Sequence, residues 1–444
     1  MEDFIFAPIV LAIGMGIHAL VLRRHPPAEG QILTVGFAAH VVSAIAQVLL
    51  VKYYFKGGGD MLAYYEYGVP IAELLRSDFP RFAPELARAF FQQDDFFLPA
   101  GFAGAGSTQS MSAAAAFLLF LLGNSLYAAA ILIGIATYVS QVLIAWALRD
   151  YFPRNQHRLV LVGVTLLPSA VFWSSALLKE PLIMAALGPI MLGLKWLSLG
   201  RRRVFALLLI APSVVLMAMI KPYVLMTLSL SAAIFYLWTR FSVGQSAALK
   251  PFAVIMAAAI GMGGLVLGSR YFGKAESDSA AASLAAQRRV GYTVEGGSNY
   301  QLDAPATSED VQKRSLSQEL ALAPLALLTA FFRPLLFEAR NAVQFANALE
   351  ATYLLVLFIQ VLRRRRWSGL VATIGGSPAM MFCFVFAFAL ALGTGLASSN
   401  LGTLSRYRAP MMPFFFTLLL VLRAPAQAPV GVHDAGLSPA AATR

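Results

Sequence analysis

The 444-residue chain is 59% apolar and only 13% charged, with a mean hydropathy of +0.70. This composition excludes an ordinary soluble domain and indicates a polytopic membrane protein. A single cysteine, Cys383, excludes a disulfide framework and a cysteine-based metal site within one chain. The histidines are scattered singly, so a metal would need carboxylate ligands. In a membrane protein, the net charge of +12 has to be interpreted from where the charged residues lie along the chain.

The first apolar segment, 4–22, is expected to be a retained span. Acidic residues precede it and Arg23-Arg24 follow it, whereas a cleaved signal peptide has its positive charge before the apolar core. This order predicts an outer N-terminus. A second span, 31–51, leads into the polar stretch 52–109, which contains an amphipathic patch suited to a helix lying on the membrane.

Further apolar segments are long enough, or nearly so, to cross about 30 Å of hydrocarbon. They predict an all-α, polytopic transmembrane helical bundle of about eleven spans, within a range of about ten to thirteen, whose extracytoplasmic loops carry short amphipathic helices. Two shorter apolar runs, 111–122 and 320–332, suit re-entrant or interfacial segments. After the first two, the expected spans are 124–148, 159–175, 181–199, 204–220, 222–239, 251–268, 343–362, 376–396 and 409–423.

The placement of charge predicts the orientation. The loops assigned to the inner side hold the basic runs Arg201–Arg203 and Arg363–Arg366, but their acidic residues are only Glu29, Asp150 and Asp434. This positive-inside pattern favours an outer N-terminus and an inner C-terminus. The basic runs adjoin helix ends, where they meet anionic headgroups, so the net charge does not indicate a nucleic-acid partner.

We expect a single integral-membrane domain over 1–423. Its long outer loops are 52–109 and 269–320, and the stretch 424–444 is expected to be a disordered cytoplasmic tail because it is rich in alanine and proline.

Five compact polar motifs fall on the predicted outer face. A short turn needs only small residues, yet these motifs carry charged side chains beside aromatic ones at the membrane boundary. Charged groups at such depth commonly face a cavity or a bundle interior. The motifs are GGGDMLAYYEYG (57–68), WSSALLKE (173–180), IKPY (220–223), FRPLLFEARN (332–341) and NLGTLSRYR (400–408).

The first motif places Asp60 after a glycine turn, with Tyr64 and Tyr65 close behind. A capping aspartate before a short helix would give the same pattern. Tyrosines beside a carboxylate suit stacking on sugar rings, although tyrosine is also common at membrane interfaces. We interpret Asp60 as a candidate base and the two tyrosines as candidate substrate contacts.

Three charged residues interrupt apolar sequence in the next two motifs. Lys179 and Glu180 suggest an ion pair lining the site, and the alternative is a snorkelling interfacial pair. Lys221 stands where two apolar segments join with almost no loop, so solvation does not explain its charge. We expect both lysines to contact phosphate, with Glu180 orienting Lys179 or acting as a reserve base.

Arg333, Glu338 and Arg340 lie just before the span 343–362. Helical i, i+3 spacing predicts a polar stripe from Glu338 down to Glu350 that enters the bilayer. The alternative is a buried ion pair, such as Arg340 with Glu338 or Glu350, that holds helices together.

Arg406 and Arg408 flank a tyrosine on the predicted outer face, against the positive-inside pattern. They therefore need a local anionic partner. Phosphate or pyrophosphate matches the guanidinium fork, and lipid headgroups would serve as well.

In chain order, the set GGD-x3-Y, W-S-S-x3-K-E, K-P-Y, F-R-P-x3-E-x2-N and S-R-Y-R-x-P resembles bacterial membrane proteins of exopolysaccharide and O-antigen gene clusters. These look like GT-C-type glycosyltransferases and Wzy-type polymerases, and the resemblance covers about 57–413. It implies an enzyme at the outer face of the bacterial cytoplasmic (inner) membrane. Its implied partners are a polyprenyl-(di)phosphate-linked saccharide donor, a saccharide acceptor, membrane lipids and other polysaccharide-assembly proteins.

The GT-C resemblance implies that an acidic residue of the first large outer loop is the base, and Asp60 is the matching position. This chain departs from that pattern, because its acidic loop follows the second span and has no adjacent acidic pair. Resemblance to Wzy-type polymerases instead implies outer-loop arginines, which Arg333, Arg340, Arg406 and Arg408 would supply.

Displacement at an anomeric carbon needs a carboxylate to accept the acceptor's proton and cations to stabilise the departing phosphate. Asp60 is the first candidate base, followed by Glu180 and Glu338. The expected phosphate clamp is Lys179, Lys221, Arg333, Arg406 and Arg408. No cofactor is expected, and a divalent metal on Asp60 and a second carboxylate has no support from spacing.

Other classes fit part of the pattern. A transporter or flippase would also place charges in a bundle, but the sequence has no internal repeat and no matched pair of broken helices. A ligase-like enzyme would share the donor and differ in the acceptor. A non-catalytic scaffold predicts that alanine at Asp60, Lys179 or Arg406 leaves polysaccharide production intact.

Overall fold

The computed structural model describes residues 2–55, 58–93, 96–98, 106–241, 284–289, 299–300, 302–303 and 315–425. The expected span 251–268, most of the loop 269–320 and the tail beyond 425 lie outside these residues. Every regular element in the described ranges is a helix, and the extended pairing there is one isolated bridge between Asn299 and Asn400. The all-α class is therefore confirmed for this part of the chain.

Eight helices of the described ranges are long and apolar enough to cross a membrane. At a rise of about 1.5 Å per residue, helices of this length match the hydrocarbon thickness. The N-out, C-in orientation remains a prediction. The eight are α1 (Glu2–Leu22), α2 (Pro27–Leu49), α6 (Leu126–Leu148), α9 (Lys179–Ser198), α10 (Arg203–Ile220), α11 (Pro222–Phe241), α17 (Ala342–Arg364) and α19 (Pro378–Ala397), with α2 extended by the π-helical turn η1 (Leu50–Tyr54).

The expected span 159–175 is not one helix. It divides into α7 (His157–Thr165) and α8 (Pro168–Phe172), because Pro168 lacks an N–H and disfavours helical geometry in the residue before it. The expected last span is also shorter than predicted, since α21 (Met412–Arg423) has 12 residues. The remaining helices are α3 (Asp60–Ser77), α4 (Phe79–Phe90), α5 (Ser107–Leu121), η2 (Arg149–Tyr151), η3 (Arg154–Gln156), α15 (Leu316–Ala321), α16 (Ala323–Phe332), η4 (Leu336–Glu338), α18 (Trp367–Gly376) and α20 (Leu401–Tyr407).

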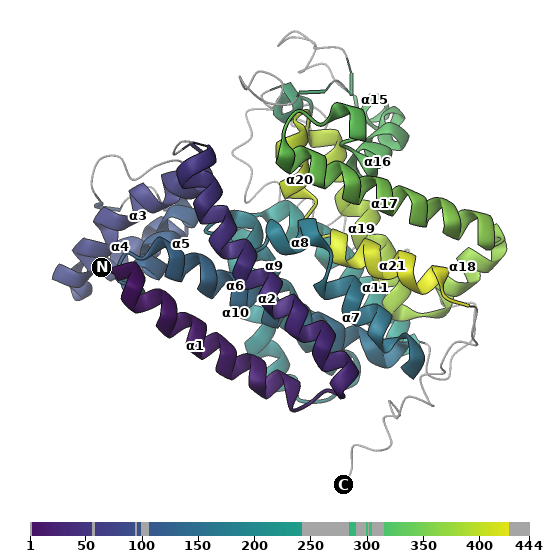
Figure 1. The fold of residues 1–444 in the computed structure, drawn as a ribbon, viewed down its shortest axis with the longest axis horizontal. Helices are drawn as coiled ribbons and strands as arrows, with labels where there is room; N and C mark the ends of the chain where they lie inside the picture. The colour runs from purple at the N-terminus through teal and green to yellow at the C-terminus, as the bar shows by residue number, and fades with distance from the viewer. Residues whose placement is uncertain are drawn as a thin grey trace. The chain divides into compact units, whose positions relative to one another are not determined.

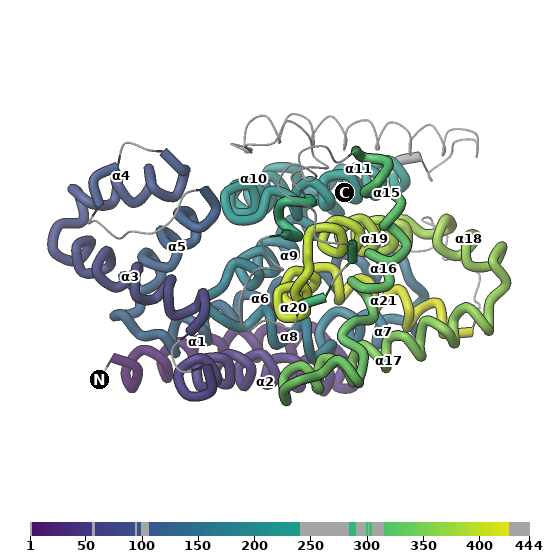
Figure 2. The backbone as a smooth tube through the Cα atoms, turned by 90° about the horizontal axis from the view of Figure 1, so that it is seen from above, coloured from purple at the N-terminus to yellow at the C-terminus, as the bar shows by residue number. Residues whose placement is uncertain are grey.

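The chain divides into two compact units. Unit 1 comprises 1–147, 164–166 and 170–225. Within it α1 and α2 run as an antiparallel pair (Figure 1), and α3, α4 and α5 lie together (Figure 2). The helices α6 and α9 approach closely where the N–H of Gly188 donates to Oγ of Ser140 at 2.7 Å. Small residues allow such close approach between membrane helices.

Unit 2 comprises 148–163, 167–169 and 226–444. Its helices α16, α17, α19 and α21 pack together (Figure 1). Aromatic side chains lie among them, and the rings of Phe331 and Phe415 stack with centroids 4.0 Å apart. Such rings bury large apolar areas and prefer offset or edge contacts. This core holds the ends of α16 and α20, where the arginine-bearing motifs lie.

Candidate functional site

Asp60 begins α3 directly after Gly59, whose φ of +114° favours glycine. Its side chain is exposed, and a carboxylate in a first helical turn is favoured by the helix dipole. One turn later Tyr64 is buried, while the hydroxyl of Tyr65 donates to the carbonyl of Asn124 at 3.1 Å. Burial raises the pKa of Tyr65, so its hydroxyl keeps its proton at neutral pH. The motif thus combines an accessible carboxylate with tyrosines that anchor α3.

Lys179 lies in the first turn of α9 and points to the start of α5. Its Nζ donates to Oγ of Ser107 and to Oγ1 of Thr108, both at 3.0 Å. The sequence suggested Lys179 as the partner of Glu180, but the structure places Lys221 beside that carboxylate. Successive residues of a helix point in different directions, which explains the difference.

Glu180 and Lys221 form a buried ion pair. Nζ of Lys221 lies 2.6 Å from Oε1 of Glu180 and also donates to the hydroxyl of Tyr223 at 3.1 Å. Lys221 follows the end of α10, and Pro222 begins α11, so the lysine stands at a break between two helices. The motifs around 173–180 and 220–223 therefore meet within unit 1.

Arg333 follows α16 and holds Glu338 through one edge of its guanidinium, formed by Nε and Nη2. Nε donates to Oε2 of Glu338 at 3.1 Å, Nη2 donates to Oε1, and the N–H of Leu335 adds a bond to Oε2 at 2.8 Å. Partial burial favours the protonated form, but the bonds from Arg333 and Leu335 outweigh it and hold the pKa of Glu338 below its ordinary value. Glu338 is thus a charged, bidentate partner of Arg333.

The expected polar stripe does not run continuously from Glu338. Glu338 ends the short turn η4, and α17 starts only at Ala342, with Asn341 as its N-cap. The cap accepts the N–H of Gln344 at 2.9 Å, a contact that fixes the start of the helix. Arg340 is exposed before this cap, and its backbone N–H donates to Gln344, so the arginine side chain lies on the surface of unit 2.

Arg408 is completely buried at the end of α20. Its Nη1 donates to the carbonyl oxygens of Ala330 at 3.2 Å and Arg333 at 2.6 Å. Nε and Nη2 of Arg408 are buried without a hydrogen-bond acceptor among the described residues. Burial lowers the pKa of Arg408, and the charge of Glu350 opposes that shift. Arg406, two residues earlier, is only partly buried.

Glu350 is held by the start of α8. Its carboxylate accepts the N–H of Ser169 at 2.7 Å and the hydroxyl of Ser169 at 2.5 Å. The predicted polar residue inside α17 is therefore buried, but its hydrogen-bond partner is a serine rather than the suggested Arg340. Pro168 makes this possible, because it ends the preceding segment and leaves the N–H of Ser169 unused by a helix.

Three residues near Arg333 and Arg408 were not predicted from the sequence: Arg288, Tyr300 and Glu319. Arg288 forms a doubly hydrogen-bonded pair with the fully buried Glu319, with both N–O distances 2.9 Å, and also donates to the carbonyl of Leu396 at 2.8 Å. The ring of Tyr300 lies 4.5 Å from the guanidinium carbon of Arg333. Burial raises the pKa of Tyr300 to about 12. A glutamate directly before the apolar run 320–332 was the available signal.

Two groups of charged residues result, one in each unit. The lysine cluster is Lys179, Glu180 and Lys221 in unit 1. The arginine cluster is Arg288, Glu319, Arg333, Glu338 and Arg408 in unit 2. Among the residues that the structure describes, no group of three or more histidine, cysteine or acidic side chains is arranged to hold a metal ion.

No protein-family model matches the chain, and neither a curated protein nor a solved structure shows significant similarity to it.

Proposed function

We propose that the protein is a membrane glycosyltransferase or polymerase that uses a polyprenyl-phosphate- or polyprenyl-diphosphate-linked saccharide at the extracytoplasmic face. The observation that carries this proposal is Arg408. Its guanidinium is fully buried, yet its two hydrogen-bond acceptors in the described residues are neutral carbonyl oxygens.

A buried guanidinium with two nitrogens, Nε and Nη2, that lack an acceptor among the described residues is costly unless an acceptor arrives. Phosphate oxygens are suited to that role because a guanidinium donates to them through two parallel bonds. The neighbouring Arg333 cannot offer its Nε and Nη2 to a ligand while both nitrogens donate to Glu338. Arg408, with Arg406 two residues earlier, is therefore our first choice for contact with a phosphate of the lipid-linked substrates.

Asp60 is our choice for the base because its carboxylate is exposed at a helix start. Glu338 is bound by Arg333 and Glu180 by Lys221, so we assign both carboxylates to positioning these cations. In the reaction, the acceptor hydroxyl oxygen forms a bond to the anomeric carbon and its proton passes to Asp60. The bond between that carbon and the phosphate oxygen breaks, and its electron pair leaves with the phosphate.

The first test replaces Asp60 by asparagine. Glu66→Gln is the matched control, because Glu66 is also exposed and lies on the same helix. We expect Asp60→Asn to reduce polysaccharide about 100-fold or more at a normal protein level, the usual scale for loss of a general base, and Glu66→Gln to leave it unchanged. Normal product from Asp60→Asn would contradict the proposed role.

The second test concerns Arg408. We expect Arg408→Lys to lose saccharide transfer while keeping the protein folded, since lysine retains the charge but not the fork. Arg363→Lys, at an exposed site in the same unit, is the control. Wild-type transfer by a folded Arg408→Lys would count against phosphate contact at this position.

The lipid-linked saccharide that accumulates in a deletion strain then separates the two enzyme classes. A complete repeat unit indicates a polymerase, and a truncated one indicates a single-sugar transferase. Accumulation of a finished product on the inner face would instead favour a flippase.

A further inference from the structure

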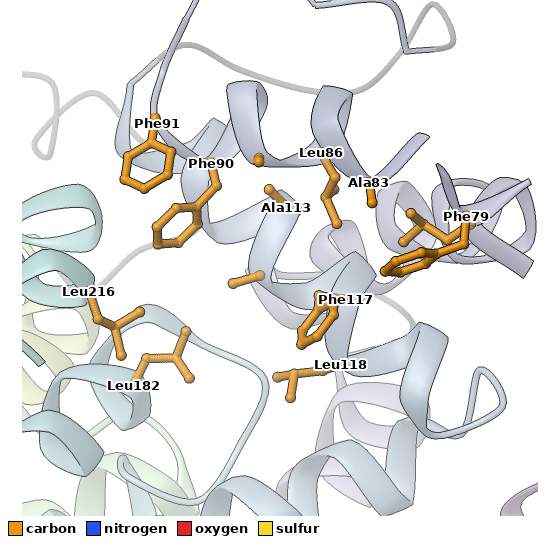
Figure 3. Close-up of a pocket in the computed structure, with 13 residues that line it drawn as sticks. Phe79, Ala83, Leu86, Phe90, Phe91, Ala113, Phe117, Leu118, Leu182 and Leu216 are labelled. Atoms are coloured by element: carbon orange, nitrogen blue, oxygen red, sulfur yellow. The ribbon is translucent and has the colours of Figure 1, made fainter. Parts of the chain in front are cut away.

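An apolar pocket of about 430 Å³ lies in unit 1, and no charged residue among those described lines it. Its volume falls within the range of about 300–1,000 Å³ that is usual for small-molecule sites. The side chains of α4 and α5 form one side, and Leu182 of α9 and Leu216 of α10 approach from the other (Figure 3). All thirteen lining residues are apolar.

The sequence of α4 explains why the pocket exists. Phe79, Ala83, Leu86 and Phe90 follow helical spacing and line the pocket, while Arg88 on another side of the helix pairs with Glu85 at 3.1 Å. The apolar side of α4 is not fully covered, since Phe79 remains 47% exposed. The hollow is therefore open to a hydrocarbon chain from outside the helices.

Polar residues lie close in sequence to the residues that line this pocket. Gln92, which follows the pocket residues Phe90 and Phe91, donates to Oγ of Ser110 and to the carbonyl of Met219, both at 3.0 Å. Nearby on α5, Ser107 and Thr108 hold the ammonium group of Lys179. Thr108 precedes the pocket residue Ala113 by five positions, which is about 7.5 Å along a helix.

Lys179 is joined to the pocket through α9 as well. Leu182 lies one turn after Lys179 on the same side of that helix and lines the pocket. A cation therefore lies about one helical turn from a lining residue of an otherwise apolar hollow. This combination complements a molecule with one anionic head and a hydrocarbon tail.

We infer that this pocket binds the isoprenoid chain of a polyprenyl phosphate, with Lys179 contacting its phosphate. The inference rests on the proposed function for the choice of a prenyl chain over an acyl chain. It deepens that proposal by assigning the lipid part of the substrate to the pocket formed by α4, α5, Leu182 and Leu216 (Figure 3).

The test is photo-crosslinking of the full-length protein in phosphatidylcholine nanodiscs. The probe is a short-chain polyprenyl phosphate with a diazirine in its chain, and labelled peptides are identified by mass spectrometry. We expect label in 75–91 and 113–118. Unlabelled polyprenyl phosphate should compete for the site, whereas the corresponding polyprenol should compete about tenfold less well because it lacks the charge-assisted contact.

Two pocket-filling variants, Ala87→Phe and Ala114→Phe, should each reduce labelling at least about tenfold. The added phenyl ring displaces part of the lipid chain, and the apolar contacts that the chain loses lower its affinity. Ala87 is exposed, so its substitution does not disturb the core. Ala211→Phe, at an exposed site of α10 outside the pocket, is the matched control and should keep full labelling. Lys179→Ala should weaken binding and Lys179→Arg should restore it.

Labelling that neither filling variant reduces would overturn the inference. Equal competition by dioleoyl phosphatidic acid would also overturn it, because the pocket would then be a general phospholipid site. Failure of the proposed function is separate. It would appear as normal saccharide production by Asp60→Asn, a measurement that does not depend on crosslinking.

Discussion

Nζ of Lys221 lies 2.6 Å from Oε1 of Glu180, and their side chains are only 6% and 0% exposed. Glu180 is at the start of α9, whereas Lys221 stands between α10 and α11. One charged contact therefore ties together the ends of three apolar helices. The sequence suggested the adjacent Lys179, not Lys221, as the partner of Glu180.

Removing one member of this pair should be more harmful than removing both. We expect Glu180→Leu alone to destabilise unit 1 by about 3–5 kcal/mol, because the ammonium of Lys221 stays buried without its carboxylate. The double variant Glu180→Leu, Lys221→Met should recover much of that loss. Thermal unfolding in detergent measures both effects, and a double variant no more stable than Glu180→Leu would contradict a compensating pair.

The stability that the contact between Arg333 and Glu338 contributes should depend on pH. Because the pKa of Glu338 is lower in the folded protein, its stabilising effect is complete above the ordinary value of 4.5 and is lost as pH falls through the lower folded value. We expect Glu338→Gln to be less stable than wild type at neutral pH and to converge with it in acid. Unfolding temperatures measured across that pH window provide the check, and a constant difference would argue against this linkage.

Ser169 should stabilise the break between α7 and α8 through Glu350. Ser169→Ala removes the hydroxyl donor from a buried carboxylate and should cost about 1–3 kcal/mol of unfolding free energy. The control is Ser213→Ala, whose hydroxyl donates only to the carbonyl of Leu209 in its own helix among its described contacts. Equal effects of the two substitutions on the unfolding temperature would exclude a special role for the bond to Glu350.

The close approach of α6 and α9 should be sensitive to a single methyl group. A Cβ on Gly188 would lie 2.6 Å from Cα of Ser140, so Gly188→Ala forces the backbones apart and should cost about 1–3 kcal/mol. Gly16→Ala on α1 is the control, because nothing lies within 4 Å of its added Cβ. That control should be neutral or slightly stabilising, since alanine favours a helix. A stable Gly188→Ala protein would show that the helices can separate locally without loss.

Much of the helical framework could be predicted from apolar segments and their ends. For example, 343–362 corresponds closely to α17, and 376–396 to α19. These predictions succeed because a membrane helix satisfies its backbone hydrogen bonds within its own segment. The interruption at Pro168 was missed because the apolar run continues across it, although the proline was a local signal.

The sequence by itself determined the membrane character, the positions of most long helices and the concentration of charge in a few short motifs. Only the tertiary structure decided the partners: Lys221 for Glu180, Arg333 for Glu338 and Ser169 for Glu350. The physical reason is that helix formation depends on local backbone bonding. A buried charge, in contrast, is satisfied by whichever opposite charge or donor the packing of distant segments brings within a few ångströms.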